Sequence, residues 1–359
     1  MNSNIEKLLA SGKLQCPACS GALQLEDSLK CHACGQTFPL LTDIPVLMPG
    51  PEEFVGLWQN RLGNFVASQQ RNIESNKRLI ASPTVYPPLR ERLKKITHAR
   101  MENLQTLLEL MAPQRDLGPG IPPTEHTDAV GSFMLIVYLL RDWGWDTDEV
   151  DILCNKVIEI LPPDLSPESL LVLGAGACRD SFNLHNHYNC PLTISVDIAP
   201  LMLLGASRIV SGGELNLYQI QPNNVRNEQD NVSFWKLRAP RKPDPDFLYM
   251  LADATRLPFA KDAFHVVLTP FLIDAVGEDL RNFAPRINQI LQPGGYWVNY
   301  GAMTFLPGIN YTADEVLSIV SDSGFRILHH GFSTKPHLAP RESCQRSVYD
   351  CLYFTAVKE

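Results

Sequence analysis

The second half of the chain alternates between short apolar runs and amphipathic stretches. Apolar runs at 169–173, 192–196, 247–252 and 264–268 have the length of buried strands, and each stops at a glycine or a polar residue. Helical spacing follows in Leu280, Phe283, Ile287, Ile290 and Leu291, and three further strands are expected at 296–303, 325–332 and 347–358. The last strand follows the one before it without a helix. The pattern therefore predicts an α/β fold whose sheet ends in a strand hairpin.

The first half has a different pattern. A short alternating piece at 22–30 predicts a small hairpin, whereas the spacing of Ile96, Leu104, Leu107, Leu108 and Met111 is helical. Glycine and proline interrupt that pattern at 112–128, where we expect one long loop. We therefore divide the chain into a small module at 1–50, a helical segment and linker at 51–165, and an α/β domain at 166–359.

Composition and charge narrow the class of protein. Of the 359 residues, 45% are hydrophobic, which is typical of a folded protein. The net charge of −8 argues against a partner that is bound through many phosphates. The longest apolar run, 130–140, is too short to cross a bilayer, and the N-terminus lacks the apolar core of a signal peptide. Nine cysteines, five of them scattered, suggest a reducing compartment. We expect a cytoplasmic protein with no membrane partner.

Four of the cysteines form two pairs with the spacing of metal ligands. Cys16 and Cys19 make the first Cys-x-x-Cys, Cys31 and Cys34 make the second, and the predicted hairpin separates them. Two such turns can place four thiolates around one Zn²⁺, with reduced core cysteines as the alternative. Because the protein fills all four positions, we expect a structural zinc ribbon with no place for a catalytic water. The tail that follows, FPLLTDIPVLMPG, resembles the end of the small zinc-ribbon proteins that activate methyltransferases.

The strongest candidate for a ligand site lies at the first strand of the α/β domain. That strand runs into Gly174-Ala175-Gly176, where glycines allow backbone to approach a ligand, and a helix N-terminus follows. The second strand ends at Asp197, about 20 residues on, where a carboxylate can bind both ribose hydroxyls. The third strand ends at Asp253 and the fourth at Thr269. This arrangement predicts a nucleotide-like cofactor, although Asp253 alone could also be a solvated loop acid.

The order of these elements resembles the class I S-adenosylmethionine-dependent methyltransferase fold, which is Rossmann-like and has seven strands with an antiparallel last strand. A dehydrogenase that binds NAD would be expected to continue with a further helical crossover. The resemblance implies that Gly174 and Gly176 contact the methionine part of the cofactor and that Asp197 holds the ribose. Asp253 and Ala254 would meet the adenine, and Thr269 would complete the cofactor-binding set.

A narrower set of motifs resembles the carnosine N-methyltransferase family. These motifs are LLRDW, the Gly-x-Gly-x-x-Arg loop, MLLGAS, QPNN, PFLIDAVGEDL, ILQPGGYWVNYG and VYDCLYF, spread over residues 135 to 357. The resemblance implies that Arg179 supports the cofactor carboxylate, that Asp274 faces the substrate, and that Tyr349 lines the substrate pocket. Family members carry a histidine after the W-x-N-x-G strand, where this chain has Leu306, and only one of their substrate tyrosines has a match here.

These observations predict an N-methyltransferase that acts on a small imidazole- or amine-containing metabolite, histidine-like or a dipeptide. If Asp274 accepts a hydrogen bond from one imidazole N–H, the other ring nitrogen becomes the nucleophile; alternatively, Asp274 caps the following helix. A second hypothesis is an RNA or protein methyltransferase that docks through the ribbon and the basic run at 90–100. That run is also typical of a solvated helix face. A third is a binding module without activity. We favour a small-molecule acceptor and expect no nucleic-acid partner.

Overall fold

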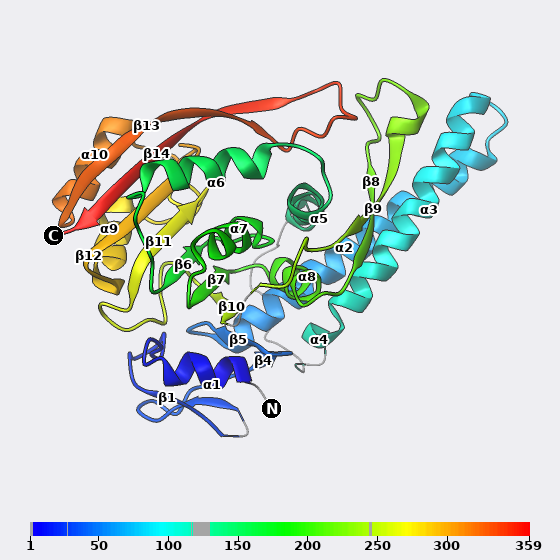
Figure 1. Ribbon diagram of the computed structural model, residues 1–359. Helices are drawn as coiled ribbons and strands as arrows, with labels where there is room; N and C mark the ends of the chain where they lie inside the picture. The colour runs from blue at the N-terminus through cyan, green and yellow to red at the C-terminus, as the bar shows by residue number, and fades with distance from the viewer. Residues whose placement is uncertain (1–2, 27, 116, 118–129, 244–245) are drawn as a thin grey trace.

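The computed structural model describes residues 3–26, 28–115, 117, 130–243 and 246–359 (Figure 1). A mixed sheet of nine strands forms its centre, in the order β13-β14-β12-β11-β6-β7-β10-β5-β4. Seven of these strands belong to the predicted α/β domain, and β14 is antiparallel to both of its neighbours. The predicted class I fold, a parallel sheet with an antiparallel last strand, is therefore confirmed. The seven strands are β6 (Leu170–Leu173), β7 (Thr193–Asp197), β10 (Phe247–Ala252), β11 (Phe264–Pro270), β12 (Leu291–Gly301), β13 (Phe325–His337) and β14 (Ser347–Lys358).

Helices cover both faces of this sheet, which explains why its strands read as continuous apolar runs. Along β6 the side chains alternate: Leu170 and Val172 pack into one core, and Leu171 and Leu173 pack into the other. The first core includes residues of α5 (Val130–Trp143), α6 (Glu149–Ile160), α7 (Arg179–Tyr188) and α8 (Pro200–Val210). The second includes α1 (Ser3–Ala10), α9 (Leu280–Ile290) and α10 (Ala313–Asp322). Each face thus has its own hydrophobic core.

The N-terminal module is joined to the main sheet. Its own sheet contains β1 (Leu23–Leu25), β2 (Leu29–Cys31) and β3 (Thr37–Phe38), as the predicted hairpin requires. The tail then forms β4 (Leu40–Leu41) and β5 (Ile44–Leu47), and β5 pairs in parallel with β10. The α/β domain therefore continues into the ribbon through backbone hydrogen bonds.

The helical segment consists of a long antiparallel pair beside the sheet. It comprises α2 (Pro51–Ala81) and α3 (Pro87–Leu110), followed by the short α4 (Ala112–Arg115). Most of the long loop expected at 112–128 lies outside the described residues. The pair extends away from the sheet, and a hairpin of β8 (Leu215–Ile220) and β9 (Val232–Leu237), linked by η1 (Glu228–Asn231), lies along α3 (Figure 1). The alternation in LNLYQI and VSFWKL is typical of such a hairpin, which the sequence analysis did not predict.

Candidate active site

One cavity of about 540 Å³ opens at the carboxyl ends of β6, β7, β10 and β11. In sheets of this kind ligands bind where the strand order reverses, which here is between β6 and β11. The volume lies within the range of about 300–1,000 Å³ that is typical of small-molecule sites. Seven of the predicted site residues line it: Gly174, Gly176, Asp197, Asp253, Ala254, Asp274 and Tyr349.

The glycine loop between β6 and α7 is held by the acid at the end of β7. Gly174 and Gly176 have φ angles of 71° and 53°, a left-handed conformation that favours glycine. The Gly176 N–H donates to Asp197 Oδ2 at 2.7 Å, and the Ala199 N–H donates to Oδ1 at 2.8 Å. Burial raises the pKa of Asp197, although these two N–H groups favour its charged form. Asp197 therefore sets the shape of the loop and also lines the cavity.

The side chain of Asp253 is oriented by hydrogen bonds within its own loop. Its Oδ1 accepts hydrogen bonds from the Thr255 backbone N–H and hydroxyl, both at 2.8 Å. Within the described chain no partner is recorded for Oδ2, so this oxygen can accept a further donor. Thr269, by contrast, is buried in the sheet, where it donates to Asn299 Oδ1 and accepts from Trp297 Nε1, both at 3.0 Å. It does not line the cavity, and its predicted contact with a cofactor stays a prediction.

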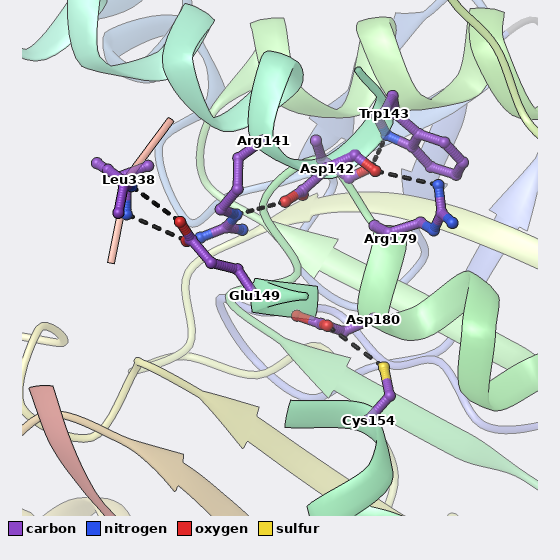
Figure 2. A network of polar contacts seen from close by, with 10 residues as sticks. Arg141, Asp142, Trp143, Glu149, Cys154, Arg179, Asp180 and Leu338 are labelled. Carbon is purple, nitrogen blue, oxygen red and sulfur yellow. Dashed lines mark hydrogen bonds and ion pairs between the residues drawn. The ribbon is translucent and has the colours of Figure 1, made fainter. Parts of the chain in front are cut away.

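The end of α5 is attached to the glycine loop by a buried polar network (Figure 2). Trp143 Nε1 donates to the Ala177 carbonyl at 2.8 Å, and Arg179 Nη1 donates to the Asp142 carbonyl at 3.1 Å. Arg179 also lies over the Trp143 ring, 4.9 Å from its centroid. Arg141 Nε donates to Asp142 Oδ1 at 2.6 Å on the opposite side of Asp142. The structure therefore places Arg141, and not the predicted Arg179, on the cavity.

Arg141 stays protonated although its side chain is largely buried. Burial alone would lower its pKa, but the Asp142, Asp180 and Glu149 carboxylates together outweigh that effect and raise it. The sequence analysis named Arg141 and Asp142 only as part of the LLRDW motif. A charged pair at the end of an apolar helix was the signal that could have identified this residue.

Asp274 lines the cavity from the segment after β11. It is 9% exposed and accepts the Thr304 N–H at 2.8 Å, and burial raises its pKa. Asp279, and not Asp274, caps α9, where it accepts the Arg281 N–H at 2.8 Å. The alternative explanation for Asp274, a helix cap, is therefore not what the structure shows.

Aromatic side chains from three segments of the chain line the cavity. The His337 ring lies 4.7 Å from that of Tyr349 and 5.6 Å from that of Phe271, measured between centroids. Tyr349 is 37% exposed, and Lys335 also lines the cavity. The predicted strand stopped at residue 332, whereas β13 continues to His337, so the sequence analysis missed both Lys335 and His337.

His337 should make the stability of the protein depend on pH. Burial, followed by the nearby Arg141 and Lys335, lowers its pKa to about 4. The unfolded chain takes up this proton near pH 6.5 and the folded protein only near pH 4, so the free energy of unfolding falls as pH decreases through that interval. Between pH 7.5 and 5.0 the loss is at most about 2 kcal/mol. Denaturant unfolding at both pH values should show a smaller loss for His337→Gln, and an equal loss in both proteins would contradict this assignment.

The four predicted zinc ligands come together at one point of the N-terminal module. Their sulfur atoms all lie within 4.8 Å of one another, with Cys16 to Cys34 at 3.8 Å and Cys19 to Cys31 at 3.5 Å. Zn²⁺ with tetrahedral Zn–S bonds of about 2.3 Å requires sulfur separations of about 3.8 Å. The cluster therefore fits zinc. No helix among the described residues is long and apolar enough to cross a bilayer.

Comparison with known families gives a match that includes all of residues 166–359. The family model described as carnosine N-methyltransferase matches residues 124–359, more than half of the chain. Two curated carnosine N-methyltransferases are similar to it: that of Schizosaccharomyces pombe is 22% identical over 111 residues, and that of Dictyostelium discoideum is 22% identical over 102. These segments cover 26% and 27% of this chain, and 30% and 22% of the relatives. The chain thus spans less than a third of either relative's length.

Solved structures with a similar fold include two S-adenosylmethionine-dependent methyltransferases. The protein from Mesorhizobium loti is 17% identical with a TM-score of 0.40, and the match covers 58% of this chain and all of that one. The protein from Aquifex aeolicus is 13% identical with a TM-score of 0.41, covering 63% of this chain and 98% of the other. At these scores the two structures add no argument. The fold assignment therefore depends on strand order and on the family match.

Proposed function

The chain belongs to the carnosine N-methyltransferase family, and from that membership we propose that it transfers a methyl group from S-adenosylmethionine to a nitrogen of a small metabolite. The proposed acceptor carries an imidazole or an amine, as a histidine-containing dipeptide does. The observation that carries this proposal is that one cavity joins the glycine loop and Asp197 to Asp274 and Tyr349. A donor and an acceptor could therefore lie side by side in it.

The residues at the glycine-loop end fit S-adenosylmethionine. A Cβ placed on Gly176 would meet nothing within 4 Å, so the loop leaves space for ligand atoms beside its backbone. Asp197 would accept the ribose hydroxyls, and the Asp253 Oδ2 atom would accept a donor from the adenine. We assign the cofactor carboxylate to Arg141, because it lines the cavity and Arg179 does not. Arg179 would then act indirectly, through Trp143 and the Asp142 carbonyl.

This assignment predicts different effects for the two arginines. Arg141→Met should weaken binding of S-adenosylhomocysteine about 10- to 100-fold, since a charge-assisted hydrogen bond is worth about 1.5–3 kcal/mol. Arg179→Met should weaken it less, and the exposed Arg341→Met should leave it unchanged. Isothermal titration measures all three. If Arg179→Met has the larger effect, the carboxylate contact belongs to Arg179 instead.

The part of the cavity lined by Asp274 and Tyr349 would hold the acceptor. When bound, S-adenosylmethionine supplies a methyl group that is already activated, so the protein has to orient a neutral nitrogen in line with it and exclude water. Asp274 would accept one imidazole N–H and so make the other ring nitrogen the nucleophile. Phe271, His337 and Tyr349 would pack around the ring, and the low pKa of His337 keeps its own imidazole neutral. An acceptor imidazole with a pKa of about 6.5 is mostly neutral at pH 7.

The N-terminal ribbon would hold Zn²⁺ through Cys16, Cys19, Cys31 and Cys34 and would brace the catalytic sheet. Four thiolates leave no coordination position open, so the metal would stabilise the fold and take no part in methyl transfer. Its place is supported by the pairing of β5 with β10, the strand that ends one residue before Asp253. The division into units at residues 50 and 165 and the cytoplasmic location stay predictions.

Transfer of label from the cofactor tests the proposed function. Purified protein incubated with methyl-labelled S-adenosylmethionine and a metabolite extract should release a labelled small molecule with a methyl group on nitrogen. Transfer confined to RNA or to protein would overturn the proposal in favour of a macromolecular acceptor. The same assay with Arg341→Met serves as a control for changes remote from the cavity.

A further inference from the structure

The loop that joins β13 to β14 is flanked by cavity-lining residues on both sides. His337 precedes residues 338–346 and Tyr349 follows them, and both line the cavity. This loop reaches the connection between β8 and β9, where Ser343 forms a backbone bridge with Val225 (Figure 1). The positions of His337 and Tyr349 therefore depend on what holds the loop.

The first residues of the loop are held by α6. Glu149, at the start of that helix, is fully buried, and its carboxylate oxygens accept the N–H groups of Leu338 and Ala339 at 3.1 and 2.8 Å (Figure 2). These two bonds fix the backbone directly after His337.

The middle of the loop is held by the QPNN segment after β8, a motif that the proposed mechanism does not use. The Cys344 N–H donates to the Asn224 carbonyl at 2.6 Å, and Asn224 Nδ2 donates to Gln345 Oε1 at 2.8 Å. Gln221 Nε2 donates to Ser343 Oγ at 3.3 Å. Asn224 has a φ of 56°, a left-handed conformation that asparagine adopts more readily than most residues. The QPNN segment is therefore a second anchor for the loop.

A buried amide on β8 supplies a third anchor. Gln219 is 5% exposed, and its Oε1 accepts the indole N–H groups of Trp145 at 2.7 Å and Trp235 at 3.1 Å. Because an indole N–H can only donate, the two rings fix the amide oxygen on their side and direct its NH2 group to Glu342 Oε2, at 3.3 Å. The site requires an acceptor and a donor on one short side chain, which an amide provides.

Gln219 thus connects the cofactor end of the site to the loop. Trp145 lies two residues after Trp143, and Trp143 Nε1 donates to the Ala177 carbonyl in the glycine loop. Glu342, on the other side of the amide, belongs to the loop between β13 and β14. One side chain therefore contacts both the turn after α5 and the loop that carries the aromatic residues of the cavity.

We propose that Gln219 is a positioning residue for the methyl acceptor. Its contact with Glu342 holds residues 338–346 and thereby keeps His337 and Tyr349 in place around the acceptor. Gln219 is not among the described residues that line the cavity, so it acts through this loop and not by touching the substrate. This inference rests on the proposed function, which assigns His337 and Tyr349 to the acceptor.

An exchange of charge between Gln219 and Glu342 tests this inference. Gln219→Glu keeps both indole contacts, because carboxylate oxygens accept them, but it sets a second carboxylate against Glu342. With carnosine as the probe acceptor, kcat/KM should fall about 10-fold while the Kd of S-adenosylhomocysteine stays within about twofold. Adding Glu342→Gln restores an amide donor between the two side chains and should recover most of the loss. Gln70→Glu, an exposed position on α2, is the matched control and should leave kcat/KM unchanged.

Amide hydrogen exchange gives a second readout that does not depend on activity. The N–H groups of residues 338–346 should exchange about 10-fold faster in Gln219→Glu and return to the wild-type rate when Glu342→Gln is added. Asn224→Gly removes an exposed side-chain contact with Gln345 and keeps a residue suited to the positive φ. It should show smaller changes in the same direction, and it tests the loop even if Gln219→Glu does not fold.

Other results would overturn the inference. Faster exchange of the loop with kcat/KM unchanged would show that the loop does not place the acceptor. A Gln219→Glu protein that loses affinity for S-adenosylhomocysteine as far as it loses kcat/KM would assign Gln219 to the cofactor end. No recovery on adding Glu342→Gln would mean that the contact with Glu342 is not the cause. If the wild type does not methylate carnosine, the proposed acceptor class fails, whereas unchanged exchange of residues 338–346 overturns the holding role of Gln219 by itself.

Discussion

Asp274→Asn is expected to lower kcat/KM for methyl transfer by about 100- to 1,000-fold, while the affinity for S-adenosylhomocysteine stays within about twofold of the wild type. An amide side chain has one accepting oxygen, which the Thr304 N–H would occupy, and its NH2 cannot accept an imidazole N–H, so the acceptor would bind without a fixed tautomer. The backbone contact to Thr304 can persist, since the amide oxygen also accepts the N–H that now binds Asp274 Oδ2. The loss should therefore be in catalysis and not in folding.

The activity of the wild type should also fall as pH decreases. Burial raises the pKa of Asp274, so its carboxylate is protonated at a higher pH than that of an ordinary aspartate. The acceptor imidazole is also protonated as the pH decreases, and it then has no free lone pair to accept the methyl group.

Asp279→Asn is the matched control for Asp274→Asn, because it removes a carboxylate five residues away that caps α9 and does not line the cavity. If Asp274→Asn retains the wild-type rate, or if its cofactor affinity falls as far as its rate, the acceptor-facing role of Asp274 is wrong.

Cys16→Ser combined with Cys31→Ser is expected to remove bound zinc and to destabilise the whole protein. Both sulfurs are buried, and a structural zinc site contributes about 10 kcal/mol or more in isolated peptides. The effect should reach the catalytic domain, because Phe38 and Leu47 share a hydrophobic core with β6 and β7. A loss of about 3–5 kcal/mol would lower the melting temperature by about 4–7 °C in a chain of 359 residues.

Backbone hydrogen bonds also connect the ribbon to the loop at the cofactor end of the cavity. The Ala260 N–H donates to the Lys13 carbonyl at 2.8 Å, and the Gln15 N–H donates to the Pro258 carbonyl at 3.0 Å, which ties the ribbon to the loop after Asp253. The double variant should therefore bind S-adenosylhomocysteine more weakly as well. Cys344→Ser, which replaces an exposed cysteine outside the cluster, is the control. Zinc loss with stability and activity unchanged would show that the ribbon does not brace the sheet.

Local patterns in the sequence were enough to predict the sheet and the ends of its strands. Gly174, Asp197 and Asp253 each come directly after a buried apolar run, so a reading of the chain places them at one edge of a parallel sheet. The zinc ligands were predictable for a related reason. Their spacing of two residues within each pair sets the geometry of a metal knuckle without reference to the rest of the fold.

Contacts between distant segments could not be predicted in the same way. The pairing of β5 with β10 joins residues about 200 positions apart, and nothing in either segment specifies which sheet edge the other will meet. Lys335 and His337 depend on how far β13 continues along β14, which is set by pairing and not by the alternation of β13 itself. The choice between Arg141 and Arg179 was decided by the hydrogen bonds of Trp143 and Asp142, which only the folded chain brings together.

The most direct test of the central claim is a crystal structure of the protein with S-adenosylhomocysteine and carnosine. The account predicts that the cofactor lies along Gly176, Asp197 and Asp253, and that Asp274 accepts one imidazole N–H while the other ring nitrogen faces the cofactor sulfur. A cofactor bound elsewhere, or an imidazole that does not reach Asp274 in a cavity occupied by cofactor, would contradict the account.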